Sequence, residues 1–181
     1  MNTKHTCLLA ATAALLASCS KTETTAEASP ASDATAPSAA LTAVIDASPE
    51  GEAGLIHLVR QTAQPGDTVT VSGRVMGNAS PFVDGRAAFI LGDPEVLTPC
   101  NANPDDACET PWDACCDSKE DKKRGTATIQ VVDADGRVLK EGIEGVGGIE
   151  KLSTLTVSGT VAEGSTADLL VINANAIDVA K

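Results

Sequence analysis

The chain has 181 residues, with 13 Lys and Arg against 25 Asp and Glu, which gives a formal net charge of −12 at pH 7. Nucleic-acid binding uses Lys and Arg for phosphates and aromatic rings for unpaired bases, so this charge and an aromatic content of 2% argue against nucleic acid as a partner. Because His5 and His57 are its two histidines, the chain has little material for a three-histidine metal site or a Ser-His-Asp triad.

Residues 1–18 are predicted to be an export signal. Lys4 precedes an apolar run over residues 7–17, which has the length of a signal-peptide core and is too short to span a bilayer. The Leu-Ala-Ser-Cys sequence at residues 16–19 resembles the lipobox of bacterial lipoproteins. The resemblance implies that Cys19 is acylated, becomes the mature N-terminus and anchors the protein in a membrane. An ordinary signal peptide with an incidental cysteine is the alternative.

The lipobox resemblance also implies a location. Ser20 follows the cysteine, where the lipoprotein pattern would use Asp to retain a protein in the inner membrane. We therefore expect a cell-envelope protein attached through Cys19, in the outer membrane and facing the periplasm, with another envelope protein as a candidate partner. Anionic lipid headgroups repel an acidic chain, so the lipid must supply the attachment.

Residues 19–48 are predicted to be a disordered linker. This segment consists mainly of Ala, Thr, Ser, Glu and Pro, and such a composition buries too little apolar surface to offset the chain entropy of folding. The remaining residues, 49–181, are enough for one folded domain.

Helical spacing of apolar residues predicts a short helix over residues 52–63, which ends before Pro65-Gly66. His57 lies off the apolar stripe of this helix and is predicted to be a surface side chain. Strand signals, with period-two alternation at residues 67–76 and 152–161, then predict five strands. They cover residues 67–76, 86–91, 126–132, 152–161 and 168–179, with a tight turn at 134–136, a flexible glycine-rich segment at 142–148 and an irregularity at 173–175.

Two of these strands share a pattern, Ser-Gly-x-Val at residues 72–75 and again at 158–161. Glycine inside a strand often marks a sharp bend at a barrel corner. The valine-alternating strands, the hairpin and the late paired strands resemble an OB-fold, and in particular the small periplasmic OB-like domains of bacteria. The resemblance covers residues 67–179 outside the loop 93–125. It implies a mostly all-β domain, a small OB-like β-barrel with a short N-terminal helix and a long cysteine-containing loop.

OB-folds often bind oligonucleotides, but the first strand offers Arg74 as its one outward cation and no aromatic residue. The basic cluster at residues 119–124 is interleaved with acidic residues and is predicted to be a solvated loop. No hydrolase elbow, P-loop, dinucleotide fingerprint or zinc-protease helix occurs in the sequence. We therefore expect a noncatalytic binding or structural module rather than an enzyme.

The loop 93–125 lacks periodicity and contains four cysteines. A structureless loop of this length needs a staple or a function. Its residues 110–116, Thr-Pro-Trp-Asp-Ala-Cys-Cys, also resemble a Pro-Trp-Asp-x-Cys-Cys segment of uncharacterised secreted proteins from planctomycete-type bacteria, a group with no activity to transfer. Trp112 is predicted either to anchor a partner or to plug the open end of the barrel and pin the loop.

Three interpretations of the cysteines remain open. An oxidising compartment favours two disulfides, with Cys115 and Cys116 each paired to one of Cys100 and Cys108. A metal site for zinc or Cu(I) is the second interpretation, although the spacing lacks the Cys-x-x-Cys of zinc ribbons. A thiol-redox pair at the two adjacent cysteines is the third, although the flanking carboxylates disfavour a thiolate. The carboxylates near the cysteines that could attract a cation are Asp105, Asp106, Glu109, Asp113 and Asp117.

Overall fold

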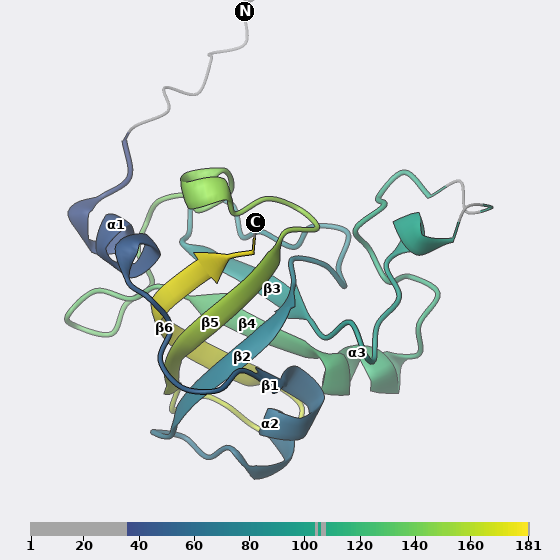
Figure 1. Ribbon diagram of the computed structural model, residues 1–181, viewed down its shortest axis with the longest axis horizontal. Helices are drawn as coiled ribbons and strands as arrows, with labels where there is room; N and C mark the ends of the chain where they lie inside the picture. Colours follow the sequence, from purple (N-terminus) through teal and green to yellow (C-terminus); the bar gives the residue numbers. More distant parts are fainter. Residues whose placement is uncertain (1–35, 104, 106–107, 181) are drawn as a thin grey trace, which may run out of the picture. The chain divides into compact units, whose positions relative to one another are not determined.

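A computed structural model of the protein describes residues 36–103, 105 and 108–180 (Figure 1). The predicted export signal, the lipidation site Cys19 and Ser20 lie outside the described residues, so their roles stay predictions. None of the helices in the described ranges has the length and apolar character needed to cross a membrane.

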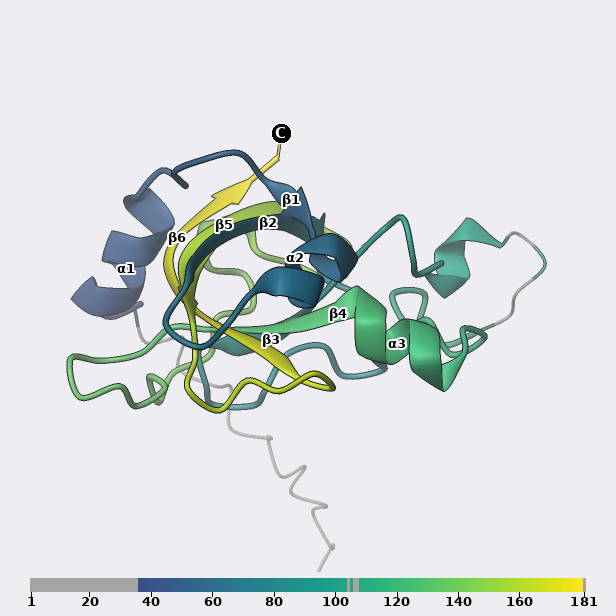
Figure 2. The same cartoon turned by 90° about the horizontal axis from the view of Figure 1, so that it is seen from below.

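Five strands form a closed β-barrel. Their order is β2-β3-β4-β6-β5, and β5 pairs back with β2 to close it, while the short strand β1 adds to β2 in parallel (Figure 1, Figure 2). The strands are β1 (Gly54–Leu55), β2 (Thr68–Arg74), β3 (Ala88–Gly92), β4 (Thr126–Gln130), β5 (Thr154–Val161) and β6 (Leu170–Val179). The predicted mostly β fold and small OB-like barrel are confirmed, and the predicted strands all occur with shifts of a few residues at their ends.

The barrel interior is filled by the apolar residues of the alternating patterns. Val71 of β2 lies opposite Val157 of β5, and both are fully buried, as are Phe89 of β3, Ile129 of β4 and Ile172 of β6. Alternation in each strand places these side chains on one face because successive residues of a strand point to opposite sides. In β2 and β5 the alternating sequence pattern therefore identified the inward face correctly.

The two Ser-Gly strands are neighbours, and their glycines lie where backbones approach closely. A Cβ on Gly73 would lie 2.7 Å from the carbonyl oxygen of Gly92, and one on Gly159 would overlap the carbonyl oxygen of Asn173. Beside Gly159 the register shifts, because Ser158 pairs with Ala176 while Gly159 pairs with Ala174. The extra residue on β6 forms the irregularity predicted at residues 173–175, and such a bulge bends the strand.

The linker prediction is wrong for residues 39–46, which form the helix α1 (Ala39–Asp46) against the barrel. Leu41 is fully buried in the main core, and Val44 and Ile45 pack beside it. The helix lies along β6 in both views (Figure 1, Figure 2). Average composition missed α1 because three apolar residues at helical spacing suffice to make one buried face, even in a polar segment.

Loop contacts hold both ends of α1. The Ser38 hydroxyl caps the helix by accepting from the Leu41 amide at 3.2 Å, and it also donates to the Glu141 carboxylate at 2.5 Å. The glycine-rich segment predicted to be flexible contains a 3₁₀ turn, η2 (Val146–Gly148), where a Cβ on Gly147 would overlap Ile45. The compact unit that contains the barrel therefore begins at residue 36 rather than at residue 49.

The predicted helix over residues 52–63 is shorter in the structure. It is α2 (Ile56–Thr62), since Gly54 and Leu55 pair with β2 as β1. The prediction that His57 is a plain surface side chain is wrong. Both its backbone amide (2.9 Å) and its Nδ1 (2.8 Å) bond to Oδ2 of the fully buried Asp93. Asp93 thus caps the start of α2 from the end of β3, a role that α2's own residues do not fill.

The loop 93–125 is partly regular. It contains a 3₁₀ turn, η1 (Cys100–Ala102), and ends in the helix α3 (Lys119–Gly125). The prediction that the basic cluster is a solvated loop is wrong for its backbone, because Ser118 caps a helix there by accepting from the Asp121 amide. The basic side chains still face solvent in part, and Arg124 pairs with Asp121 at 2.7 Å.

Candidate functional site: a cysteine cluster

Three of the four loop cysteines lie together. The Sγ atoms of Cys100, Cys108 and Cys115 are all within 4.8 Å of one another, and those of Cys100 and Cys115 are 3.5 Å apart. Cys100 is 5% exposed, Cys108 is half-buried and Cys115 is exposed, so the cluster extends from the loop interior to the surface. The loop that carries it projects from one side of the barrel (Figure 1, Figure 2).

A short backbone ladder builds the cluster. The amide of Cys100 donates to the carbonyl of Asp113 (2.8 Å), and that of Asn101 donates to the carbonyl of Pro111 (2.9 Å). These bonds bring η1 alongside the Trp112 region and so place Cys115 beside Cys100. Ala114, which lies between Asp113 and Cys115 in the chain, is buried with Met76 and Leu97 in a second apolar cluster.

Trp112 fastens this loop to the segment after β2. Its Nε1 donates to the carbonyl of Ala79 (2.9 Å), and its own carbonyl accepts from the amide of Gly77 (3.0 Å). The side chain is half-buried, and within the described residues it belongs to neither buried apolar cluster. These hydrogen bonds confirm the prediction that Trp112 pins the loop, whereas the prediction that it plugs the open end of the barrel stays a prediction. Its use as a partner anchor stays a prediction.

The nearby carboxylates serve the loop backbone. Oδ1 of Asp113 accepts from the amide of Ala114 (2.7 Å), and Oδ2 of Asp117 accepts from the amide of Thr98 (2.8 Å). Asp105 and Glu109 are exposed, and Asp106 lies outside the described residues. Among the described residues, the cluster of candidate ligands contains sulfur atoms and no carboxylate.

The three thiols differ in acidity. Burial, followed by hydrogen bonding to Cys115, raises the pKa of Cys100 to about 12. The Thr110 hydroxyl, 3.3 Å from the sulfur, and a backbone hydrogen bond to Thr110 lower the pKa of Cys108. The hydrogen bond with Cys100 lowers the pKa of Cys115, but hydrogen bonding to Cys116 and burial outweigh it, so the pKa is raised. Cys108 is thus the thiol that most readily becomes a thiolate, the form that binds metals.

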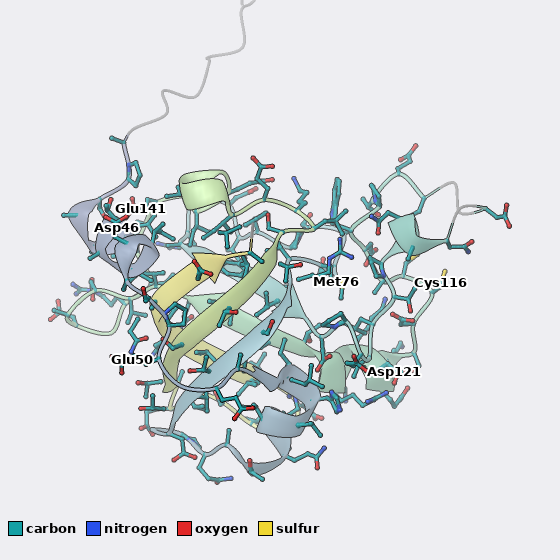
Figure 3. All side chains as sticks on the ribbon, in the orientation of Figure 1. Asp46, Glu50, Met76, Cys116, Asp121 and Glu141 are labelled. Atoms are coloured by element: carbon teal, nitrogen blue, oxygen red, sulfur yellow. The ribbon has the colours of Figure 1, made fainter. Side chains whose placement is uncertain are left out.

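The predicted pair of disulfides is not formed, because Cys100, Cys115 and Cys116 are present as thiols. Cys116 lies at the outer edge of the loop (Figure 3). It is exposed, with its sulfur 3.9 Å from that of Cys115, and it is not a member of the three-cysteine cluster. Adjacent cysteines cannot easily direct both sulfurs to one point, which explains why one of the pair joins the cluster and the other does not.

Three sulfur atoms at these separations can hold one soft metal ion. Thiolates select zinc or Cu(I), whereas hard cations prefer oxygen donors. The same proximity would allow Cys100 and Cys115 to form one disulfide after a small shift, since an S–S bond needs sulfurs about 2.05 Å apart.

The sequence spacing did not reveal which three cysteines would meet, because the ladder between η1 and Pro111 to Asp113 joins residues distant in the chain. No family model, curated protein or solved structure matches this chain, so the site must be interpreted from its own residues.

Proposed function

We propose that the protein is a noncatalytic metal-binding module of the cell envelope, with Cys100, Cys108 and Cys115 as ligands for a soft ion, zinc or copper. The observation that carries this proposal is the approach of the three sulfurs to within 4.8 Å of one another. Buried structural cysteines have no need to gather in this way, and three converging sulfurs match the donors that soft ions prefer.

The loop supports the proposal because it holds Cys100 and Cys115 in place before a metal arrives. A hydrogen bond from its backbone amide to the carbonyl of Asp113 fixes Cys100. Ala114, which precedes Cys115, anchors the chain in the apolar cluster of Met76 and Leu97. A ligand set ordered in advance loses less entropy on binding. The acidic surface of the chain also favours the approach of cations.

The test is metal titration of the full chain under reducing, anaerobic conditions. We expect one zinc or copper ion per chain, and a loss of binding in Cys108→Ser. The matched control is Cys116→Ser, which removes a neighbouring thiol outside the cluster and should keep the stoichiometry. Metal binding that is unchanged in Cys108→Ser would contradict the proposal.

We also propose that Cys19 carries the lipid that holds this module at the membrane. The support is the lipobox-like sequence at residues 16–19. In cells expressing the full chain, Cys19→Ala should move the protein from the membrane to the soluble fraction and abolish labelling by radioactive palmitate. Palmitate labelling that persists in Cys19→Ala would refute the anchor.

The distance of 3.5 Å between the sulfurs of Cys100 and Cys115 favours thiol-disulfide exchange as a second candidate function. The two thiols would reduce a disulfide oxidant to two thiols and form one intramolecular bond. Intact mass of the metal-free chain after treatment with oxidised glutathione tests this. A loss of two hydrogens, reversed by a reductant and absent in Cys100→Ser, is expected. Formation of mixed disulfides alone would exclude this candidate.

A further inference from the structure

The ligand set of the cluster is three sulfurs. In the described part of the chain, Cys100, Cys108 and Cys115 form the group whose ligand atoms converge, and no histidine or carboxylate joins them. A structural zinc site is closed by four protein ligands in a tetrahedron, so three would leave one position open. Soft Cu(I) is selected by thiolates and does not need a fourth ligand, so the same three sulfurs complete its shell.

Of the described donors outside the cluster, one histidine and two carboxylates are engaged in other contacts. His57 bonds through Nδ1 to the buried Asp93, and the carboxylates of Asp113 and Asp117 accept from loop amides. Moving either carboxylate toward the sulfurs would disturb a hydrogen bond that shapes the loop. To close a zinc site with a fourth protein ligand, Cys116 or a loop carboxylate would have to move into the cluster, whereas an ion that accepts three sulfurs needs no further ligand.

We propose that the cluster binds Cu(I) through three thiolates and prefers it to zinc, an inference that rests on the proposed metal-binding function. Three Cu–S bonds form, the three thiol protons pass to solvent, and the copper stays in the +1 state throughout. The ion is supplied as a Cu(I) complex whose own ligands are released as the Cu–S bonds form, so no oxidant or reductant takes part.

Cys116 gives this site an exchange ligand. It is exposed, and its sulfur is 3.9 Å from that of Cys115, the most exposed member of the cluster. Copper can leave by breaking its bond to Cys115 while a bond to Cys116 forms, and the proton of the incoming thiol passes to the departing thiolate. Buried Cys100 keeps its bond during this step. Cys116 should therefore affect the rate of copper transfer rather than the affinity.

The experiment uses the full chain, reduced and anaerobic, in competition with a coloured Cu(I) chelator and, separately, with zinc. We expect one Cu(I) per chain, retained in excess zinc, and X-ray absorption showing three Cu–S bonds. Cys108→Ser should bind Cu(I) at least about tenfold more weakly. Substitution of a residue that only hydrogen-bonds a metal ligand already costs about tenfold or more in metal affinity, and the loss of a ligand itself should cost at least as much. Cys116→Ser should keep the wild-type affinity and release copper to the chelator more slowly.

The outcomes separate the two proposals. Zinc that displaces Cu(I), or four-coordinate zinc bound more tightly, overturns the copper inference and leaves the metal-binding function intact. A chain that binds neither ion overturns both. Equal rates of release from wild type and Cys116→Ser refute the exchange role. Circular dichroism of each variant checks folding, and the wild-type X-ray absorption result does not depend on any variant.

Discussion

Leu41→Ala tests whether α1 is part of the folded domain. Leu41 is fully buried in the main core, while its helix has eight residues. A helix of that length is unstable alone in water, so α1 must persist through docking. Removing three buried carbon atoms at about 0.8 kcal/mol each gives about 2.4 kcal/mol for the transfer term. The cavity adds to this, and such substitutions cost about 2–5 kcal/mol in total.

The assay is urea unfolding of the full chain, with Leu58→Ala as the matched control. Leu58 belongs to a helix of similar length, α2, but its side chain is 52% exposed. The same substitution there should change the free energy of unfolding by no more than about 0.5 kcal/mol. Amide hydrogen exchange over residues 39–46 should also accelerate in Leu41→Ala and stay as in the wild type in Leu58→Ala.

A result in which both variants lose equally little stability would refute the reasoning. It would mean that α1 does not dock and that the linker runs to residue 48, as composition alone suggests. Detachment of α1 relieves the cavity, so the measured loss also sets a lower limit on the docking free energy of the helix.

Three further predictions concern the barrel, the cap of α2 and a turn. Gly159→Ala should lower the free energy of unfolding by about 1–3 kcal/mol in urea titration, because its Cβ would overlap the Asn173 carbonyl. Asp93→Asn should cost about 1–3 kcal/mol in the same assay, because the buried oxygen that accepts two bonds from His57 is disturbed. Hydrogen bonds from the Arg137 backbone amide, and then its side chain, lower the pKa of Asp133 below 3.8. The stability that this carboxylate contributes is therefore present above pH 3.8 and lost as the pH falls through the folded pKa. Asp133→Asn should be less stable than the wild type at pH 7, and thermal melts in acid should show this difference in stability vanishing.

Matched controls exist for these variants. Gly164→Ala introduces a Cβ that meets nothing within 4 Å, so a loss equal to that of Gly159→Ala would contradict the close-approach argument. Asp84→Asn removes an exposed carboxylate and should be near neutral at every pH. If Asp93→Asn were as stable as Asp84→Asn, the capping role of Asp93 would be wrong. A loss of stability in Asp133→Asn that does not depend on pH would exclude ionisation of the turn carboxylate as the cause of that loss.

The sequence alone was enough for the strands of the barrel. Alternation in β2 and β5 identified the inward residues, and the in-strand Gly159 marked the bend, because side-chain direction along a strand depends only on local backbone geometry. The irregularity at residues 173–175 was predicted for the same kind of reason, since it interrupts a local pattern. The export signal and the acylation of Cys19 are also sequence-level predictions, and the experiments above are their test.

Tertiary structure decided what depends on residues distant in the chain. Leu41 belongs to the core because β6 lies beside α1, and His57 is bound because Asp93, directly after β3, lies at the first turn of α2. The choice of Cys115 rather than Cys116 for the thiol cluster follows from the backbone ladder that aligns the two arms of the loop. Local patterns report which face of an element is buried, whereas the distance between two side chains far apart in the sequence is set only when the barrel closes and its loops dock.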